Sequence, residues 1–206
     1  MKRTKHKGFW DRFAGIYDRF MRKDRATYEE MYRLMGQELR TDMEALELAT
    51  GTGLIALRVA ERVKRLEATD FSEKMIAKAK SKPCPKNVRF SVQDACQLPY
   101  ADDRFDAVII ANALHIMPRP EAALESIRRV LKPKGILLAP TFVHGENDGR
   151  GGLKMRLMRL AGFQTFHWWT KKAYVEFLNA NGFQVERSVV LPGGFPLAYV
   201  SARIRK

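Results

Sequence analysis

The chain has 206 residues, of which 46% are hydrophobic, and its formal net charge is +14. This length suits one α/β domain with a small cap, and the hydrophobic share excludes a disordered chain. Two cysteines are too few for a disulfide scaffold, and no apolar run reaches the about 18 residues of a membrane span. We therefore expect a cytoplasmic protein in a reducing compartment.

The positive charge is unevenly distributed along the chain. Residues 1–40 carry 11 basic and 6 acidic side chains, residues 41–149 carry 16 and 15, and residues 150–206 carry 10 and 2. The two ends therefore hold nearly all of the excess. A basic face attracts nucleic acid, anionic lipid or an acidic small molecule, or it only keeps a protein soluble.

The first half of the chain changes from helical to strand periodicity. Apolar residues at three- and four-residue steps predict a helical cap over residues 1–40, with a break at 23–25. Strands are expected at 45–49, 66–69, 88–92 and 105–111. Helices are expected at 54–63 and after Ser72, which has the side chain of an N-cap.

The second half continues the alternation and then changes order. A helix over 120–131, closed by a loop at 132–135, precedes a strand at 136–139. An insertion over 143–168 contains a basic, Met-rich segment at 153–163. A helix capped by Thr170 and an antiparallel pair at 185–191 and 197–204 complete the region 169–206.

This order of elements predicts the fold class. Alternating strands and helices favour a Rossmann-like, doubly wound α/β domain with a mostly parallel seven-stranded sheet and an antiparallel C-terminal strand. We expect a single domain over 1–206, with its cofactor-binding core at 41–142. Ligands of such sheets bind beyond the carboxyl ends of the strands.

Three successive strand ends carry residues suited to a nucleotide-like ligand. The first has Glu47 with Gly51 and Gly53, whose missing side chains allow a tight turn and a close approach of the backbone to a ligand. Asp70 ends the second strand and is suited to ribose hydroxyls, and Asp94 follows the third. The glycine turn alone also fits a dinucleotide site. The prediction of a nucleotide-like ligand therefore depends on all three features occurring in order at successive strand ends.

Four motifs together resemble the class I S-adenosylmethionine-dependent methyltransferases, in the branch of the ubiquinone and menaquinone biosynthesis enzymes. They read ELATGTG, ATDFSEKMI, QDACQLPYADDRFDAVIIANALHIM and RRVLKPKGIL, and the N-terminal FWDRFAGIYDRF fits as well. The resemblance covers roughly residues 9–140. One departure is Ala49, which stands where the family has the first glycine of the turn.

The resemblance implies S-adenosylmethionine as cofactor, with S-adenosylhomocysteine as product, and it implies a role for each matching residue. Gly51, Thr52 and Gly53 line the methionine end of the cofactor, and Glu47 positions its amino group or the loop. Asp70 binds the ribose. Phe71 and Met75 sandwich the adenine, and Asp94 with the backbone of Ala95 fixes its edge. Ala111 and Asn112 flank the sulfonium, and Tyr17 closes over the cofactor from the cap.

A base is required only if the acceptor must lose a proton, and His115 and His144 are the candidates because each follows a strand end. No metal site is expected. The sequence after the fourth strand, Ala111-Asn112-Ala113-Leu114, lacks the Asn-Pro-Pro-aromatic motif of relatives that methylate adenine amines. We therefore expect a small-molecule, quinone-like or lipid acceptor, held between the cap and the insertion.

Several alternatives are open at this point. An anionic acceptor, or peripheral contact with an anionic inner membrane face, fits the interleaved cations of residues 153–163. An RNA methyltransferase fits the overall charge. An NAD-dependent oxidoreductase would use the same glycine turn but leaves the Asp94 segment unexplained, and an inactive binding protein would keep only the fold. The oligomeric state is open.

Overall fold

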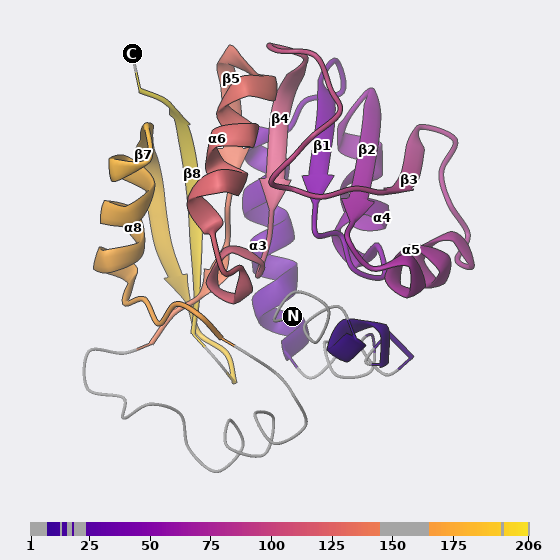
Figure 1. Cartoon of the computed structure of the whole chain (residues 1–206), viewed down its shortest axis with the longest axis horizontal. Helices are drawn as coiled ribbons and strands as arrows, with labels where there is room; N and C mark the ends of the chain where they lie inside the picture. Colours follow the sequence, from indigo (N-terminus) through magenta and orange to yellow (C-terminus); the bar gives the residue numbers. More distant parts are fainter. Residues whose placement is uncertain are drawn as a thin grey trace.

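The computed structural model describes residues 8–12, 14, 15, 18, 24–144, 165–194 and 196–205, and these build one mixed sheet flanked by helices (Figure 1). The strands are β1 (Glu44–Leu48), β2 (Arg65–Asp70), β3 (Val88–Val92), β4 (Phe105–Ile110), β5 (Leu131–Leu138), β6 (Thr141–Phe142), β7 (Phe183–Leu191) and β8 (Leu197–Ile204). The α-helices are α3 (Arg25–Glu38), α4 (Leu54–Val59), α5 (Glu73–Lys80), α6 (Pro120–Val130) and α8 (Lys171–Ala180).

The strand order confirms the predicted doubly wound architecture. Strands β3, β2, β1, β4 and β5 pair in parallel in that order, and β8 joins β5 in the antiparallel direction. β7 pairs with β8 as the predicted antiparallel partner. The described sheet has eight strands, because the two-residue β6 adds a short contact with β8 after β5 ends. The order reverses beside β1, so ligands are expected near its carboxyl end.

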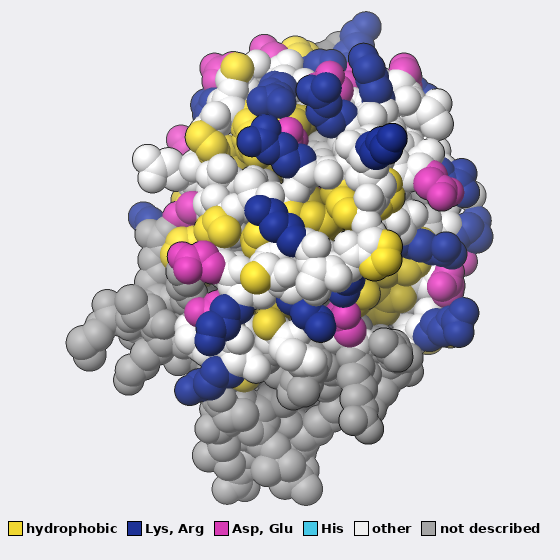
Figure 2. Space-filling view, turned by 90° about the vertical axis from the view of Figure 1, so that its right-hand side faces the viewer, with side chains coloured by type: hydrophobic (Ala, Val, Ile, Leu, Met, Phe, Trp, Pro, Cys, Tyr) yellow, Lys and Arg dark blue, Asp and Glu magenta, His cyan; other side chains and the backbone are white. Residues whose placement is uncertain are grey.

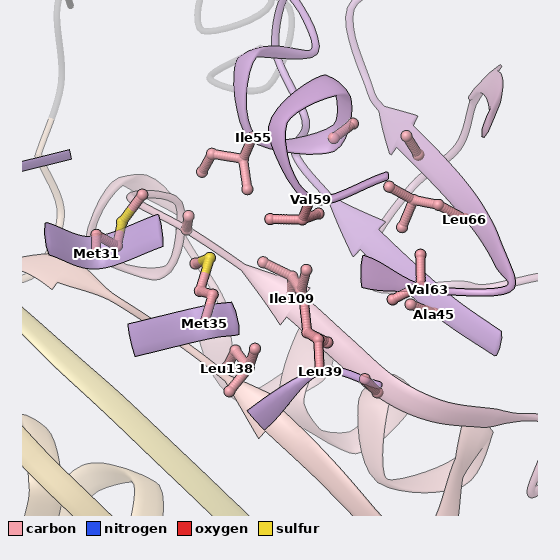
Figure 3. Close-up of a cluster of buried hydrophobic side chains, with 14 of the residues drawn as sticks. Met31, Met35, Leu39, Ala45, Ile55, Val59, Val63, Leu66, Ile109 and Leu138 are labelled. Carbon is pink, nitrogen blue, oxygen red and sulfur yellow. The ribbon is translucent and has the colours of Figure 1, made fainter. Parts of the chain in front are cut away.

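Helices cover both faces of the sheet and bury a hydrophobic layer on each. On one face, α3 and α4 pack Met31, Met35 and Val59 against β4 and β5 through Ile109 and Leu138 (Figure 3). On the other face, α6 and α8 pack against alternate residues of the same strands. The central strands are therefore buried on both sides, which explains the continuous apolar run of β4.

Two local predictions need correction. Residues 132–135 are not a loop, because β5 begins at Leu131 and contains Lys132-Pro133-Lys134-Gly135. Leu131 pairs with Phe105 and Ile136 pairs with Ala107, so an irregularity in the pairing accommodates the extra residues and the proline. The helix expected over 54–63 is α4 followed by a turn of 3₁₀ helix, η2 (Ala60–Arg62).

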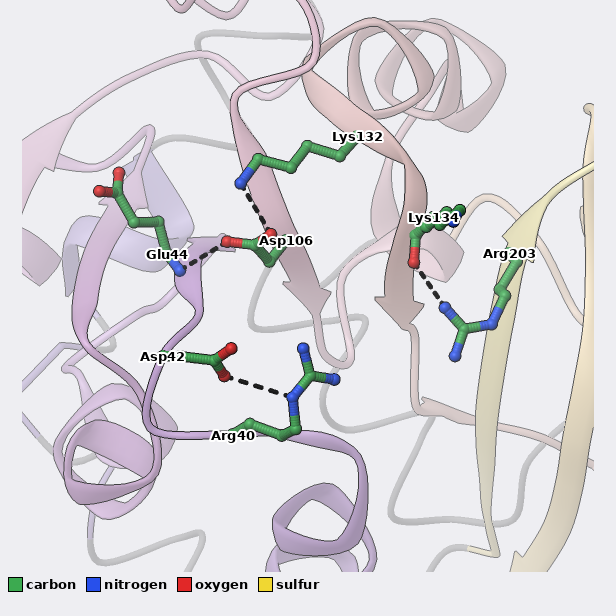
Figure 4. Close-up of polar contacts among 7 residues, drawn as sticks. All are labelled: Arg40, Asp42, Glu44, Asp106, Lys132, Lys134 and Arg203. Atoms are coloured by element: carbon green, nitrogen blue, oxygen red, sulfur yellow. Dashed lines mark hydrogen bonds and ion pairs between the residues drawn. The ribbon is translucent and has the colours of Figure 1, made fainter.

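Polar contacts fasten the amino ends of the strands, opposite the predicted site (Figure 4). Asp106, the one polar residue in the apolar run of β4, accepts hydrogen bonds from the backbone N–H of Glu44 at 2.9 Å and from Lys132 Nζ at 2.7 Å. Arg203 of β8 donates to the carbonyl of Lys134 at 2.6 Å. Asp106 is thus a structural residue that ties β1 and β5 to β4.

Among the described helices, none combines the length and the apolar character needed to cross a membrane.

Candidate functional site

The turn after β1 adopts the left-handed backbone that glycine favours at three positions. The φ angles are +53° for Ala49, +57° for Gly51 and +78° for Gly53. Gly51 lines the cavity described below, whereas Gly53 does not. A β-carbon on Gly53 would lie 2.8 Å from Phe90 Cζ, so this glycine permits close packing of the turn on β3.

Glu47 is buried beneath this turn and does not line the cavity. Thr50 Oγ1 donates a hydrogen bond to its carboxyl at 2.6 Å. The pKa of Glu47 is raised to about 8, chiefly by burial and also by the nearby carboxyl of Asp70, while the Thr50 hydrogen bond opposes the rise. Glu47 therefore organises the turn from below as a largely protonated side chain at neutral pH.

Asp70, at the end of β2, links the first two strand-end loops. One carboxyl oxygen accepts from the Gly51 N–H at 2.8 Å, and the other accepts from the Ser72 N–H at 2.8 Å. Burial raises the pKa of Asp70, while these backbone donors oppose the rise. The carboxylate is thus held in a fixed orientation at the wall of the cavity.

A cavity of about 330 Å³ opens at the carboxyl ends of β1, β2 and β4, within the size range of small-molecule and cofactor sites. Eight of the residues predicted from the sequence line it: Gly51, Asp70, Phe71, Met75, Asp94, Ala95, Ala111 and Asn112. Met75 is buried and Phe71 is 40% exposed, so Phe71 is the more accessible of these two side chains. Asp94 accepts a hydrogen bond from the Cys96 N–H at 3.0 Å, which also shapes this wall.

Three of the other predicted residues lie outside this lining. Glu47 lies beneath the turn, Gly53 packs against Phe90 within it, and Thr52 is fully buried with its hydroxyl bonded to Asp18. The remaining one, Tyr17, lies outside the described residues, as does the basic segment 153–163.

The cavity also has lining residues that were not among the predicted site residues: Trp10, Ala49, Ser72, Gln93, Cys96, Ala113, Ile116, Met117, Pro118 and Arg119. All of them except Trp10 lie in the loops that follow β1 to β4, so their position after a predicted strand was the available signal. Trp10 belongs to the N-terminal segment, and only tertiary folding places it here.

Two carboxylates fasten the N-terminal segment to the same loops. The Ser72 hydroxyl donates to Asp11 and also caps α5 by accepting from the Met75 N–H. Asp18 forms an ion pair with Lys82 at 2.7 Å, and Lys82 donates to the Thr52 carbonyl at 2.7 Å. The described part of the cap is therefore anchored beside the glycine turn.

The two histidines predicted as bases do not line the cavity. His115 is buried in η3 (Leu114–Ile116), and its Nδ1 lies 2.9 Å from Thr141 Oγ1. The pKa of His115 is lowered to about 3, chiefly by burial and also by the nearby His144 and His167. Its carbonyl accepts from the N–H groups of Phe166 and His167, so His115 secures the segment that returns to α8.

His144 is half-buried and stacks on Trp168, with ring centroids 4.1 Å apart. The backbone N–H of His144 donates to the backbone carbonyl of Trp169 at 3.0 Å. Trp168 and Trp169 thus pack the end of the insertion onto the sheet. In the described part of the chain, no group of three His, Cys, Asp or Glu side chains has the arrangement of a metal site.

Asn112 lies two residues beyond the end of β4 and has a left-handed φ of +52°. Its side-chain amide donates to the hydroxyl of Tyr28, on α3, at 2.7 Å, and its N–H donates to the carbonyl of Pro140 at 2.8 Å. These bonds hold the loop after β4 against α3 and against the loop after β5. The cavity wall beyond β4 is therefore shaped by three elements.

Comparisons with known proteins agree with this geometry. A family model described as a methyltransferase domain matches residues 46–139. YqeM of Bacillus subtilis, named as a methyltransferase, is 34% identical over 131 residues, which is 61% of this chain and 52% of YqeM. The ubiquinone/menaquinone biosynthesis C-methyltransferase UbiE of Rickettsia bellii is 30% identical over 145 residues, 63% of this chain and 58% of UbiE. The chain thus spans little more than half the length of these relatives.

Solved structures extend the likeness beyond the matched segment. A complex of DhpI with SAH aligns with a TM-score of 0.73 at 26% identity, covering 98% of this chain and 96% of the other. A chain from the complex of the Haloferax volcanii Trm112 methyltransferase activator with a methyltransferase aligns with a TM-score of 0.78 at 20% identity, covering 96% and 98%. The second likeness shows the fold alone.

Proposed function

We propose that the chain is a class I S-adenosylmethionine-dependent methyltransferase, which transfers the cofactor's methyl group to a small-molecule, quinone-like or other lipid acceptor. The observation that carries the proposal is the convergence of Gly51, Asp70 and Asp94 on one cavity from three successive strand ends. A dinucleotide site explains the glycine turn but leaves Asp94 without a role.

The residues at the cavity fit the parts of the cofactor in order. Gly51 leaves room for the methionine end, and the fixed carboxylate of Asp70 is suited to the ribose hydroxyls. Phe71 and Met75 are placed to hold the adenine, with Asp94 and Ala95 at its edge, while Ala111 and Asn112 face the sulfonium. Thr52, Glu47 and Gly53 support the turn, and Tyr17 is proposed to close over it.

Bound S-adenosylmethionine supplies an electrophilic methyl group, and the protein contributes alignment and exclusion of water. Trp10, Ile116 and Met117 give the cavity apolar walls that suit this task. Between the two candidate bases, His144 fits better, because its side chain is half-buried whereas His115 is buried against Thr141. The quinone-like acceptor is supported by the name of the Rickettsia relative.

Isothermal titration calorimetry with S-adenosylmethionine, S-adenosylhomocysteine and NAD tests the proposal. We expect the first two to bind and NAD to give no heat of binding. Asp70→Ala should weaken cofactor binding at least about tenfold, because charged hydrogen bonds to a buried partner contribute about 1.5–3 kcal/mol. Asp102→Ala is a matched control, since Asp102 is exposed and pairs with Arg129 away from the cavity. Binding of NAD in place of S-adenosylmethionine would refute the proposal.

The acceptor requires a separate measurement. The protein is incubated with radiolabelled cofactor and a panel of quinols, phenols and amines, and the products are identified by mass spectrometry. We expect a methylated product from one of these classes. A protein that binds the cofactor but methylates none of them, and instead labels RNA, would contradict the acceptor class and leave the cofactor assignment intact.

A further inference from the structure

Beside β3, at one end of the sheet, the fold gathers a row of cations that the proposed methyl transfer does not use. We call it the basic stripe, and it comprises Arg62, Lys64, Arg65, Lys74, Lys78, Lys80, Lys86 and Arg89. These residues come from η2 and the turn that follows it, from the start of β2, from α5, from the loop after α5 and from β3 itself. All eight side chains are exposed.

Pairing between β2 and β3 brings the distant parts of the stripe together. Glu67 of β2 stands opposite Arg89 of β3, and Leu66 stands opposite Val88. Asn87 reinforces the junction, because its side-chain amide donates to the carbonyls of Ala60 and Val63 at 2.8 and 3.0 Å. The cations before β2 therefore lie next to those of the loop and strand that follow α5.

The side chains of the stripe are not held in ion pairs by the rest of the described protein. Lys82 in the same region differs, since it pairs with Asp18 and serves the cap. Figure 2 shows Lys and Arg side chains spread across this side of the molecule. An unpaired row of cations raises the local concentration of polyanions.

We propose that the basic stripe binds nucleic acid through its phosphate backbone. Lysine is depleted at protein–protein interfaces, whereas nucleic-acid interfaces are strongly positive, and five of the eight stripe residues are lysines. The stripe contains no aromatic side chain to stack on bases, so the contact is to phosphates and independent of base sequence. The inference goes beyond the proposed function, because this surface is separate from the cavity lining.

Fluorescence anisotropy with a fluorescein-labelled 20-nucleotide RNA tests the proposal on the whole chain. Binding should weaken as salt rises, with a slope of about −0.7 in log K against log salt per phosphate contacted. The double variant Lys78→Glu with Lys80→Glu should lower affinity at least about tenfold and reduce that slope by about 1.4. Calorimetric binding of S-adenosylmethionine should stay unchanged, which shows that the variant is folded.

The matched control is Lys171→Glu with Lys172→Glu, which reverses two exposed charges on α8. We expect this control to bind the RNA within about twofold of the parent protein. Equal losses in the two doubles would show that net charge alone acts and would overturn the proposal. So would no binding at 50 mM salt, or tighter stripe-dependent binding of a labelled poly-glutamate, which would assign the surface to an acidic protein.

Discussion

Ala49 has a φ of +53°, although it carries a β-carbon that disfavours this conformation. The position is where the resemblance to the methyltransferases places a glycine, so the backbone of the turn is kept and the residue is strained. Asn112 has a similar φ of +52°, but asparagine tolerates the left-handed region better than alanine. The strain is therefore concentrated at Ala49.

Replacing Ala49 with glycine should stabilise the protein. The left-handed conformation costs alanine about 1–2 kcal/mol, and glycine removes this cost. The greater conformational freedom of glycine in the unfolded chain offsets about 0.4–1 kcal/mol of the stabilisation. We expect a net increase of about 0.5–1 kcal/mol in the free energy of unfolding, measured by urea denaturation. Ala45→Gly in β1 is the control and should destabilise. An Ala49→Gly protein no more stable than the parent would show that the turn is unstrained.

Glu47 should make stability fall as pH rises. Its pKa is raised in the folded state from 4.5 to about 8, so between these values the unfolded chain has released the proton and the folded protein still holds it. The unfolded state then binds fewer protons, and the free energy of unfolding decreases by on the order of 1 kcal/mol per pH unit. Above about pH 8 both states are ionised and the decrease ends.

Glu47→Gln removes this titration and provides the measurement. The free energy of unfolding of both proteins is measured by urea denaturation at pH 5, 6, 7 and 8. The parent should lose stability relative to the variant as pH rises. A difference that is constant across this range would mean that Glu47 has the same pKa in both states.

At the scale of elements, the helix caps were predictable because they depend on neighbouring residues. Ser72 accepts from the Met75 N–H at 3.1 Å and Thr170 accepts from the Ala173 N–H at 3.2 Å, as their position before a helical pattern predicts. The start of β5 was not predictable, because Lys132-Pro133-Lys134-Gly135 has the composition of a turn. Pairing of Leu131 with Phe105 overrides that local preference.

Thr170→Ala should destabilise the protein by about 1 kcal/mol, because the first turn of α8 loses its side-chain acceptor. Differential scanning calorimetry should show a lower Tm for this variant, while Thr170→Ser, which keeps the hydroxyl, should stay close to the parent. Since neither Thr170 nor any residue of α8 lines the cavity, S-adenosylmethionine affinity should be retained. Equal Tm values for Thr170→Ala and Thr170→Ser would contradict a capping role.

At the scale of the whole molecule, one sheet separates two hydrophobic layers, so each layer depends on the same strands. Ile109 of β4 belongs to the layer under α3 and α4, and Leu137 of β5 belongs to the layer under α6 and α8. Both side chains are fully buried. Loss of packing on either face therefore weakens the sheet that supports the other.

We expect Ile109→Ala and Leu137→Ala each to cost about 2–5 kcal/mol. In both variants, unfolding followed by tryptophan fluorescence and by far-ultraviolet circular dichroism should show one coincident transition. Ile109→Val, with its smaller loss of volume, should cost about 0.5–1.5 kcal/mol. Separate transitions for the two probes would show that the two layers unfold independently.

The sequence by itself determined the order of strands and helices, the caps and the turn after β1, because these depend on local periodicity and on short-range hydrogen bonds. It also indicated that Gly51, Asp70 and Asp94 follow successive strands. Only the tertiary structure decided which of the predicted residues meet at the cavity, since it buries Thr52, packs Gly53 against Phe90 and brings Trp10 to the wall. It also gathered the basic stripe from a region of nearly balanced charge, because pairing of β2 with β3 joins cations that are distant in the chain.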